Sequence, residues 1–366
     1  MPDRRSSDIG RVRSVRIVHL ETGRHYYGGA RQVVYLCEGL ARRGHECHLV
    51  CPPGAEIAAE AASVAEIHPL RLGGDLDLAA IPRLAACLKR LAPDLLHVHS
   101  RRGADPQGGI AARLAGIPAV VSRRVDNPEP RWLVALKYRL YARVITISEG
   151  IRQVLLAEGM APERVVTVLS AVDTSAFERP CERDWFNGQF GLQSDALAIG
   201  MVAQLIPRKG HAVLLDALAR LGDAAPPFRV LLFGQGPGRA ALEAQRDALG
   251  LGGRVSFAGF RDDLERVLGC LDLLVHPAFM EGLGVSLLQA AAAGVPIVAA
   301  RAGGIPEIVH DRENGFLVQP GDPDALAARI CDLLGDPSLR RRFGERGRDL
   351  AREGFSVDSM VEGNLR

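Results

Sequence analysis

Short hydrophobic runs rich in Val, Ile and Leu alternate along the chain with longer stretches of amphipathic helical character, such as residues 30–44. The short runs predict β-strands. They lie at residues 15–21, 47–52, 95–100, 119–122, 143–148, 196–205, 228–234, 254–260, 271–278, 295–300 and 315–320. Because strands that alternate with helices of ten or more residues form right-handed βαβ units, the pattern predicts parallel sheets covered by helices on both faces.

The pattern pauses once, at residues 176–195, which are polar, rich in turn-forming residues and without period. We therefore expect an α/β protein of two Rossmann-like domains, each a doubly wound parallel sheet, that face each other across a cleft. The predicted parts are a first domain over 1–177, a linker over 178–195, a second domain over 196–350 and a C-terminal helix over 351–366 that crosses back to the first domain. Such folds bind ligands beyond the carboxyl ends of their strands.

Length and composition indicate a soluble protein with two domains. A chain of 366 residues is too long for one ordinary core, and 47% of its residues are hydrophobic while 24% are charged. No apolar run reaches the roughly 18 residues that a membrane-spanning helix needs. The basic residues 1–14 lack the apolar stretch and the cleavage site of a signal peptide, so we expect a frayed N-terminus and a cytoplasmic protein.

The seven cysteines are scattered, odd in number and free of any CxxC pair. This usage indicates a reducing compartment and predicts neither a disulfide framework nor a zinc site. We also find no Asp-x-Asp element beside the predicted cleft and no histidine–carboxylate cluster in the sequence. The sequence therefore predicts chemistry without a metal.

The first half of the chain is basic. Residues 1–180 contain 25 Lys and Arg against 19 Asp and Glu, whereas the rest contains 20 against 24. Part of this charge follows first-domain strands, at Arg101, Arg102, Arg123 and Arg124, where it is placed to face a phosphorylated or lipid-linked acceptor. Nucleic acid is not an expected partner, because the basic residues are not interleaved with stacking aromatic residues.

Residues 130–144 are basic and aromatic, with the spacing of an amphipathic helix. Such a helix packs on a sheet or lies on a membrane surface. Because a predicted strand follows immediately, we expect the packed helix. A peripheral contact with the cytoplasmic face of the inner membrane stays open as the alternative.

Three junctions between a strand and a helix are rich in glycine or in positive charge. Gly28 and Gly29 follow the first strand, where they make a tight turn or let an anion approach the free N–H groups of the next helix. Arg208 and Lys209 stand before a helix in the second half, where cations oppose the helix dipole, so we expect an anion that neutralises them. Residues 234–238 imitate a dinucleotide fingerprint, but no acid follows the next strand to hold a ribose, so we expect no NAD and no other cofactor.

A fourth junction places a carboxylate at the start of a helix. Its loop and first helical residue are Glu281, Gly282, Leu283, Gly284 and Val285. We expect the last three N–H groups to point beyond the sheet, and Glu281 to accept hydrogen bonds from the hydroxyl groups of a carbohydrate. Gln289 lies one turn further on the same helix face and could reach other hydroxyls. The alternatives are that Glu281 only complements the helix dipole and that Gln289 is a surface amide.

These elements together resemble the retaining glycosyltransferases of family 4, which have the two-domain GT-B fold. The family pattern is a glycine-rich loop after the first strand, an Arg–x4–Lys–Gly element and a Glu–x7–Glu element. The corresponding positions here are Gly28–Gly29, Gln204 through Lys209–Gly210, and Glu281 through Gln289. Residues 302–327 also resemble the family closely, and the resemblance covers nearly the whole chain.

The resemblance implies a metal-independent transfer of a sugar from a nucleotide-sugar donor to an acceptor hydroxyl with retention, in the synthesis of a bacterial surface polysaccharide, lipopolysaccharide or glycolipid. The second domain would bind the donor. Lys209 and Arg208 would face its diphosphate, Glu281 would hold the sugar and Gln289 the ribose. Further donor contacts are implied for Gly28, Gly29, Gln204, Gly282, Leu283, Gly284 and Val285. Contacts on the side of the acceptor or phosphate are implied for His99, Arg123 and Arg124.

The chain departs from the family pattern at three positions. Gln289 replaces the second glutamate, Gln204 replaces the arginine, and Arg124 stands where the family often has a histidine in a T-x-H element. Gln289 still offers an acceptor to a ribose hydroxyl, but without the stronger charge-assisted bond. Because the glycines, Lys209 and Glu281 are intact, we expect a variant active site rather than an inactive one.

Two other functions fit the same residues. A sugar-nucleotide 2-epimerase shares the fold and the donor, and a non-catalytic protein that binds nucleotide sugars would explain Gln204 and Gln289. The Glu281 loop and the residues around Lys209 favour the transferase. By the frequency of donors in the family, we expect a UDP-sugar ahead of a GDP-sugar.

Overall fold

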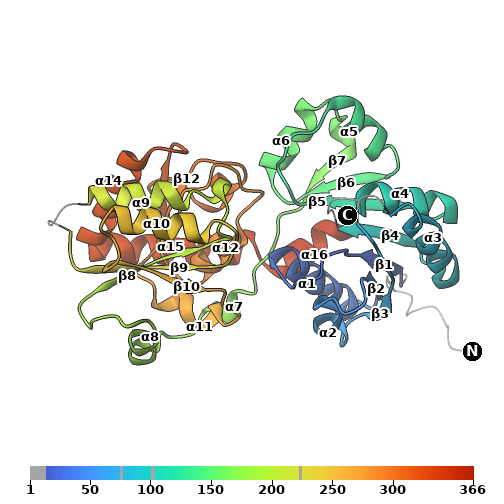
Figure 1. The fold of residues 1–366 in the computed structure, drawn as a ribbon. Coiled ribbons are helices and arrows are strands. Elements are labelled where there is room, and N and C mark those ends of the chain that lie inside the picture. The colour runs from blue at the N-terminus through green and yellow to red at the C-terminus, as the bar shows by residue number, and fades with distance from the viewer. Residues whose placement is uncertain (1–13, 75–76, 100–103, 222–224) are drawn as a thin grey trace, which may run out of the picture. The chain divides into compact units, whose positions relative to one another are not determined.

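The computed structural model describes residues 14–74, 77–99, 104–221 and 225–366 (Figure 1). Arg101 and Arg102 lie outside the described residues. The contacts divide the chain into two compact units. The first unit is Met1–Ser122 with Ala135–Val144, and the second is Arg123–Val134 with Ile145–Arg366.

The first sheet is parallel and has seven strands among the described residues, in the order β3-β2-β1-β4-β5-β6-β7. The strands are β1 (Arg16–Leu20), β2 (Glu46–Cys51), β3 (Glu66–Pro69), β4 (Leu95–His99), β5 (Ala119–Arg123), β6 (Arg143–Thr146) and β7 (Val165–Thr167). The helices are α1 (Gly28–Arg42), α2 (Ile57–Ala61), α3 (Ala80–Leu91), α4 (Ala104–Ala115), α5 (Arg131–Tyr138) and α6 (Glu149–Ala157). Five predicted strands are confirmed, whereas β3 and β7 were not singled out in the sequence.

The second sheet is also parallel, with six strands among the described residues in the order β10-β9-β8-β11-β12-β13, and all six were predicted. Its strands are β8 (Leu197–Val202), β9 (Phe228–Phe233), β10 (Val255–Gly259), β11 (Leu273–His276), β12 (Ile297–Ala300) and β13 (Gly315–Val318). The longer helices are α8 (Arg183–Phe190), α9 (His211–Arg220), α10 (Arg239–Ala248), α12 (Val285–Ala292), α14 (Pro323–Gly335), α15 (Pro337–Gly354) and α16 (Val357–Leu365). The shorter ones are α7 (Thr174–Phe177), α11 (Leu264–Val267), α13 (Ile305–Ile308) and the 3₁₀ helices η1 (Pro162–Arg164), η2 (Pro207–Lys209) and η3 (Leu268–Cys270).

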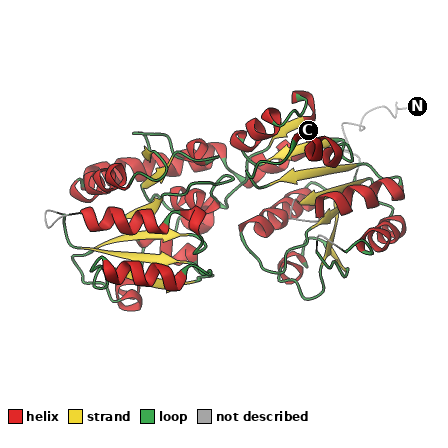
Figure 2. Cartoon of the chain, turned by 45° about the horizontal axis from the view of Figure 1, so that its top comes forward, coloured by secondary structure: helices red, strands yellow, loops and turns green. Residues whose placement is uncertain are grey.

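The alternation of side chains along a strand decides which helices cover each face of the second sheet. Ile199 and Met201 of β8 join one buried cluster with residues of α9 and α14, while Ala198 joins the other with residues of α12. Figure 2 shows helices on both sides of these strands. Both faces of a parallel sheet are therefore buried, as the near-continuous hydrophobic runs predict. The predicted fold class, two Rossmann-like parallel-sheet units, is confirmed.

The segment predicted as a linker, 178–195, contains a helix. Helix α8 occupies Arg183–Phe190 and buries Phe186 completely. Phe190 meets Phe186 and Phe233 edge to face, so the aromatic residues of this polar segment attach it to β9. The sparse apolar residues explain why no helical period is visible in the sequence.

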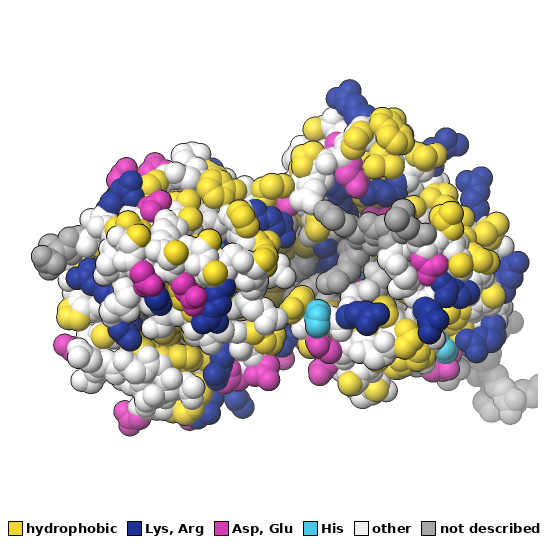
Figure 3. Space-filling model, viewed as in Figure 1, with side chains coloured by type: hydrophobic (Ala, Val, Ile, Leu, Met, Phe, Trp, Pro, Cys, Tyr) yellow, Lys and Arg dark blue, Asp and Glu magenta, His cyan; other side chains and the backbone are white. Residues whose placement is uncertain are grey.

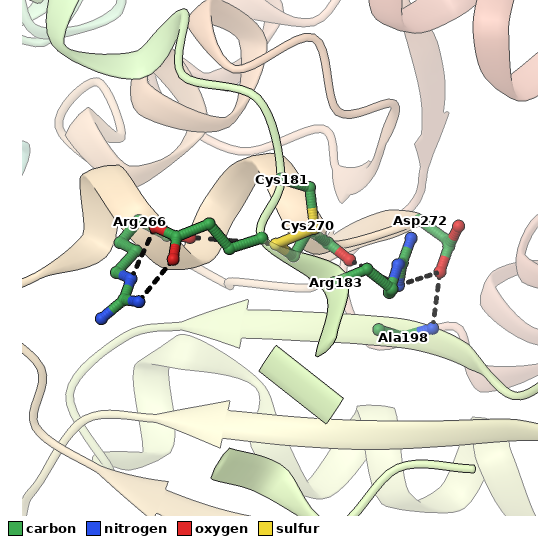
Figure 4. The surroundings of a disulfide bond; sticks show 7 residues. Cys181, Arg183, Ala198, Arg266, Cys270 and Asp272 are labelled. Atoms are coloured by element: carbon green, nitrogen blue, oxygen red, sulfur yellow. Dashed lines mark hydrogen bonds and ion pairs between the residues drawn. A yellow bond between two sulfur atoms is a disulfide. The ribbon is translucent and has the colours of Figure 1, made fainter. Parts of the chain in front are cut away.

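The prediction of no disulfide is wrong at one pair. Cys181 and Cys270 form a disulfide that joins the segment before α8 to the end of η3 (Figure 4). Arg183 donates to the carbonyl oxygen of Cys270 at 3.1 Å, which holds the same two segments together. The two cysteines are 89 residues apart, so their spacing gave no signal. Disulfides are rare in reducing compartments, so this bond does not fit the predicted compartment.

The basic and aromatic segment 130–144 forms α5, as predicted, and packs only part of its surface. Tyr138 and Val134 are buried, but Trp132 and Leu136 are 70% and 58% exposed. Hydrophobic side chains are visible over this helix in Figure 3. Among the described residues, no helix is both long enough and apolar enough to span a membrane.

Candidate functional site

The candidate site of the second unit lies where the strand order reverses, between β8 and β11. Loops that leave neighbouring strands in opposite directions open a crevice at such a point, and ligands of α/β folds bind there. The loop after β8 leads through η2 into α9, and the loop after β11 leads into α12. The predicted residues Lys209 and Glu281 come from these two loops.

Two backbone contacts tie these loops together. The N–H of Phe279 donates to the carbonyl oxygen of Arg208 at 2.9 Å. Gly210 has a φ of +78°, and a Cβ there would lie 1.9 Å from the carbonyl oxygen of Pro277. Any side chain at position 210 would push the loops apart, so glycine at this position fixes their separation.

Lys209, Glu281 and His276 form a buried polar network, which we call the β8–β11 network. The ammonium of Lys209 and Nε2 of His276 both contact Oε2 of Glu281, the imidazole at 2.8 Å. The Lys209 and Glu281 side chains are 12% and 14% exposed, and the His276 side chain is 1% exposed. A carboxylate only accepts hydrogen bonds, so His276 carries a hydrogen on Nε2.

The network keeps Glu281 ionised. Burial by itself would raise the pKa of the carboxyl group, but the hydrogen bond and charge of His276 and the charge and hydrogen bond of Lys209 outweigh it and lower the pKa to about 2. The carboxylate is therefore negative throughout the neutral range. Because its folded pKa is depressed, its contribution to stability is present above the unfolded pKa and is lost as the pH falls towards 2.

The network has binding capacity left over. Oε1 of Glu281 receives no hydrogen bond from the residues that the structure describes, since both partners contact Oε2. Lys209 has three donors, and its contact with Glu281 is its one polar contact within the same residues. An acceptor oxygen and cationic donors thus stay available side by side.

The loop before α12 adds free backbone donors. Gly284 precedes the helix with a φ of +99°, in the left-handed region that favours glycine. Within the described parts of the chain, no acceptor takes the N–H of Leu283, Gly284 or Val285. Unpaired N–H groups at a helix N-terminus attract anions, so these three residues offer donors to a negatively charged ligand.

Sequence reasoning missed two histidines at this site. His276 ends β11 and orients Glu281, and the only available signal was its place five residues before the acid. His211 follows Gly210, is 2% exposed, and neither ring nitrogen has a partner among the described residues. Burial first, and then the charges of His276 and Lys209, lower the pKa of His211 to about 4, so it stays neutral at pH 7.

Three predicted donor-binding residues lie near the β8–β11 network, in η2, after β8 and on α12, but are not part of it. Arg208 belongs to η2, and its guanidinium makes no hydrogen bond or ion pair to a described residue. Gln204 is exposed just after β8. Gln289 lies on α12 and is only 7% exposed. The alternative that Gln289 is a surface amide is therefore wrong.

The remaining predicted residues lie elsewhere. Gly28 and Gly29 open α1, as expected, with no acidic residue in the first turn. His99 ends β4 fully buried, with Nε2 at 3.1 Å from Nδ1 of His19. Arg123 ends β5 and binds Glu129 at 2.9 Å within its own loop, and Arg124 follows it, half-buried.

The expectation of no histidine–carboxylate cluster is wrong. Among the described residues, three groups could hold a metal ion by the spacing of their donor atoms, and all three are in the first unit. They are His19 with His97 and His99, His19 with Cys37 and Cys47, and His48 with Glu66 and His68. Their members come from separate strands and a helix, so the linear sequence does not bring them together. None of them includes a member of the β8–β11 network.

Comparison with known proteins matches both halves of the chain. The sequence model described as Glycosyl transferases group 1 matches residues 183–350, and the model described as Glycosyltransferase Family 4 matches residues 26–176. The 2-deoxystreptamine glucosyltransferase of Streptomyces kanamyceticus is 32% identical over 301 residues, covering 76% of this chain and 78% of that protein. The lipopolysaccharide core biosynthesis glycosyltransferase LpsE of Rhizobium meliloti is 28% identical over 365 residues, 96% of this chain and 98% of the relative.

Solved structures share the fold. The crystal structure of HepE from Anabaena in complex with UDP and glucose has a TM-score of 0.84 and 21% identity, and it covers 96% of this chain and 98% of its own. The same protein has been solved in complex with UDP-glucose, with a TM-score of 0.83 and 21% identity over 95% of this chain and 97% of its own. At this level of identity the likeness establishes the fold alone.

Proposed function

The chain belongs to the glycosyltransferases of the GT-B fold, and we propose that it transfers a sugar from a nucleotide-sugar donor to a hydroxyl group of an acceptor. The observation that carries the proposal is the β8–β11 network beside the free N–H groups of residues 283–285. A cation and unpaired amides suit a diphosphate, whereas an ionised carboxylate with a free oxygen suits sugar hydroxyls. One site thus offers contacts for both halves of a sugar diphosphate.

In the proposed reaction, the bond between the anomeric carbon and the diphosphate oxygen breaks, and its electron pair leaves with the diphosphate. Lys209, Arg208 and the free amides stabilise the charge that develops there. The acceptor oxygen bonds to the anomeric carbon on the same face, and a phosphate oxygen of the donor takes the acceptor's proton, which gives retention. Fixed charges aimed at the leaving group usually contribute more to such catalysis than any other effect, so no metal is required.

Glu281 acts on the other side of the broken bond. Its free Oε1 accepts hydrogen bonds from the transferred sugar while positive charge develops on the ring, and His276 holds the carboxylate in position. Gln289 binds the ribose further along α12. We place the enzyme in family 4 on the motifs that carry Lys209 and Glu281.

The donor we propose is a UDP-sugar, which is supported by the complexes of HepE with UDP and UDP-glucose. The acceptor we propose is a growing bacterial surface polysaccharide, lipopolysaccharide or glycolipid, which is supported by the name of LpsE.

A peripheral contact with the cytoplasmic face of the inner membrane is supported by the exposed Trp132 and Leu136 on the basic helix α5.

A panel of nucleotide sugars tests the proposal. A ligand that binds only the folded protein raises its thermal midpoint, so we expect a UDP-sugar to raise the midpoint more than the free sugar or uridine does. The best donor is then incubated with the protein and with acceptor extracts, and release of the nucleoside diphosphate is measured. Binding without any transfer or hydrolysis would make the protein a non-catalytic binder, and conversion of the donor to its 2-epimer without acceptor would make it an epimerase.

A further inference from the structure

The edge of the first sheet carries two copies of a short pattern, Glu-x-His, that the proposed sugar transfer does not use. Glu46 and His48 lie on β2, and Glu66 and His68 lie on the edge strand β3, beside it in Figure 1. Residues two apart on a strand face the same side. The parallel register pairs His48 with Glu66 and Val50 with His68, so the four polar side chains gather on one face.

Two ring nitrogens and both carboxylate oxygens of three of these side chains lie close together. Nδ1 of His48 lies 2.9 Å from Nε2 of His68 and 3.6 Å from Oε2 of Glu66, and Nε2 of His68 lies 3.6 Å from Oε1 of Glu66. A tetrahedral zinc ion with bonds of about 2.0–2.1 Å holds its ligand atoms about 3.3 Å apart. Shifts of a few tenths of an ångström would therefore bring the two nitrogens and one carboxylate oxygen to coordination distance around one ion.

The fourth side chain fixes the orientation of the central histidine. Nε2 of His48 contacts Oε1 of Glu46 at 2.9 Å. Because a carboxylate only accepts, the hydrogen of His48 is on Nε2, and the lone pair of Nδ1 points at His68 and Glu66. A carboxylate that accepts the other ring hydrogen of a ligating histidine is a usual feature of metal sites.

Burial protects the two imidazoles and leaves the carboxylate at the surface. His48 is 3% and His68 9% exposed, whereas the side chain of Glu66 is 67% exposed. The two imidazoles thus approach from the buried side, while Glu66 and a water ligand would complete the site from the solvent side. Two imidazoles with one carboxylate suit zinc and its neighbours among the transition metals, and they do not suit magnesium or calcium.

We propose that His48, His68 and Glu66 bind one zinc ion, with Glu46 as the residue that positions His48. Without the ion, the Nε2–H of His68 donates to Nδ1 of His48. The ion replaces this hydrogen, and the neutral ring of His68 then carries its hydrogen on Nδ1. The ion joins the edge strand β3 to β2 and takes no part in the proposed sugar transfer.

The other two clusters of the first unit are less suited to an ion. His97 and His99 stack with ring centroids 4.3 Å apart, and Nδ1 of His19 meets Nε2 of His99 at 3.1 Å. The rings therefore stack on one another, although Nε2 of His19 has no hydrogen-bond partner among the described residues. His19, Cys37 and Cys47 are all at most 5% exposed, so an ion held by these three side chains would have no fourth ligand from solvent.

The test uses the full-length, tag-free protein after treatment with EDTA and desalting. Cobalt(II), which replaces zinc and absorbs visible light in tetrahedral sites, is titrated into the wild type, and zinc is then added as the competitor. The variants are His48→Ala, His68→Ala, Glu66→Gln and Glu46→Gln. The matched control is His310→Ala, since His310 is a half-buried histidine beside a carboxylate, with Nδ1 3.6 Å from Glu313.

We expect the wild type and His310→Ala to bind one zinc ion per chain and to gain thermal stability from it. The histidine variants lose the cobalt spectrum, and Glu46→Gln binds about 10 to 100 times more weakly, as loss of a carboxylate that orients a ligating histidine predicts. Glu66→Gln changes only an exposed group, so it stays folded and tests the site if His48→Ala does not fold. The proposal is overturned if Glu66→Gln and His68→Ala bind zinc as tightly as the wild type, or if the wild type binds none.

Discussion

The strand order reverses at equivalent places in the two sheets, but the side chains at these two places differ in charge. Between β8 and β11 of the second unit, Lys209 and His276 surround an ionised carboxylate that keeps one oxygen free. Strands β1 and β4 of the first unit instead bring together His19, His97 and His99. The same topology thus supplies a charged site in one unit and a stack of imidazoles in the other.

The difference is one of unused binding capacity. In the first unit, His97 meets Ser122 at 2.7 Å and His19 meets His99 at 3.1 Å, so neighbouring side chains engage the rings and Nε2 of His19 is left without a partner among the described residues. In the second unit, Lys209, Glu281 and three backbone amides keep donors and acceptors for a ligand. The fold alone therefore does not show which unit binds the donor. We assign the diphosphate to the second unit because its side chains and backbone amides have donors available for it.

The largest effect is expected from Lys209. Lys209→Ala removes the buried cation that faces the leaving diphosphate, so turnover should fall by about two orders of magnitude or more. The measurement is steady-state transfer, with circular dichroism to check the fold. Lys89→Ala, which removes an exposed lysine of the first unit, is the matched control and should leave turnover unchanged. Equal kinetics of Lys209→Ala and the wild type would remove this lysine from the site.

Glu281→Gln should lose turnover by about a hundredfold, because one charge-assisted contact at the reacting centre disappears while the shape is kept. The change also leaves Lys209 unpaired, so the double variant with Lys209→Ala is needed to separate the two effects. Kinetics with the donor varied and the acceptor saturating supply both constants. A change confined to KM would show that Glu281 does not act on the sugar in the transition state.

A smaller effect is expected at the ribose. Gln289→Glu restores the acid of the family pattern and should lower the donor KM several-fold, with kcat similar, through a stronger bond to a ribose hydroxyl. The same kinetic experiment applies. Because Gln289 is buried, a thermal melt of the variant without donor serves as the control for misfolding. Loss of turnover would mean that residue 289 lies close to the bond that breaks.

The smallest effect is expected from chelation, because Lys209 and the free amides take the role of a metal in the proposed reaction. Transfer by the wild type should persist in EDTA at room temperature. Glu66→Gln is measured beside it, so that loss of the proposed zinc ion from the first unit can be distinguished from a catalytic requirement. Activity that EDTA abolishes in both proteins and manganese restores would contradict the metal-independent reaction.

The sequence predicted the layout of the sheets well because most of the longer strands are buried on both faces. The runs that became β8 and β9 are nearly continuous and apolar, interrupted only by Arg229, and parallel strands covered by helices need such runs. Strands β3 and β7 are the two edge strands of the first sheet; β7 has only three residues, and β3 alternates Glu66 and His68 with less polar residues, so neither shows a continuous apolar run. Short edge strands carry too few positions for a period to be visible.

The candidate site was predicted in part, and the contacts that the sequence did not predict share one cause. Lys209 stood out because it is a cation before a helix, and Glu281 because it occupies a glycine-rich junction before a helix. The contact between Lys209 and Glu281, and the contact of His276 with Glu281, depend on β8 lying beside β11. The sequence alone does not show which strands are neighbours. The cluster of His48 and His68 depends in the same way on the register of β2 and β3. Partners that a sheet brings together from distant segments leave no spacing to recognise.

Equilibrium binding of the nucleoside diphosphate product decides whether the β8–β11 network holds the donor. Calorimetry is run with the wild type, Lys209→Ala and Lys89→Ala, using the diphosphate of the donor that most raises the thermal midpoint, and the corresponding nucleoside for comparison. We predict equal affinity for the diphosphate in the wild type and Lys89→Ala. Binding should be at least about tenfold weaker in Lys209→Ala, as loss of a charge-assisted contact implies, with the nucleoside affected little. Undiminished binding of the diphosphate by Lys209→Ala would contradict the assignment of the donor to the β8–β11 network.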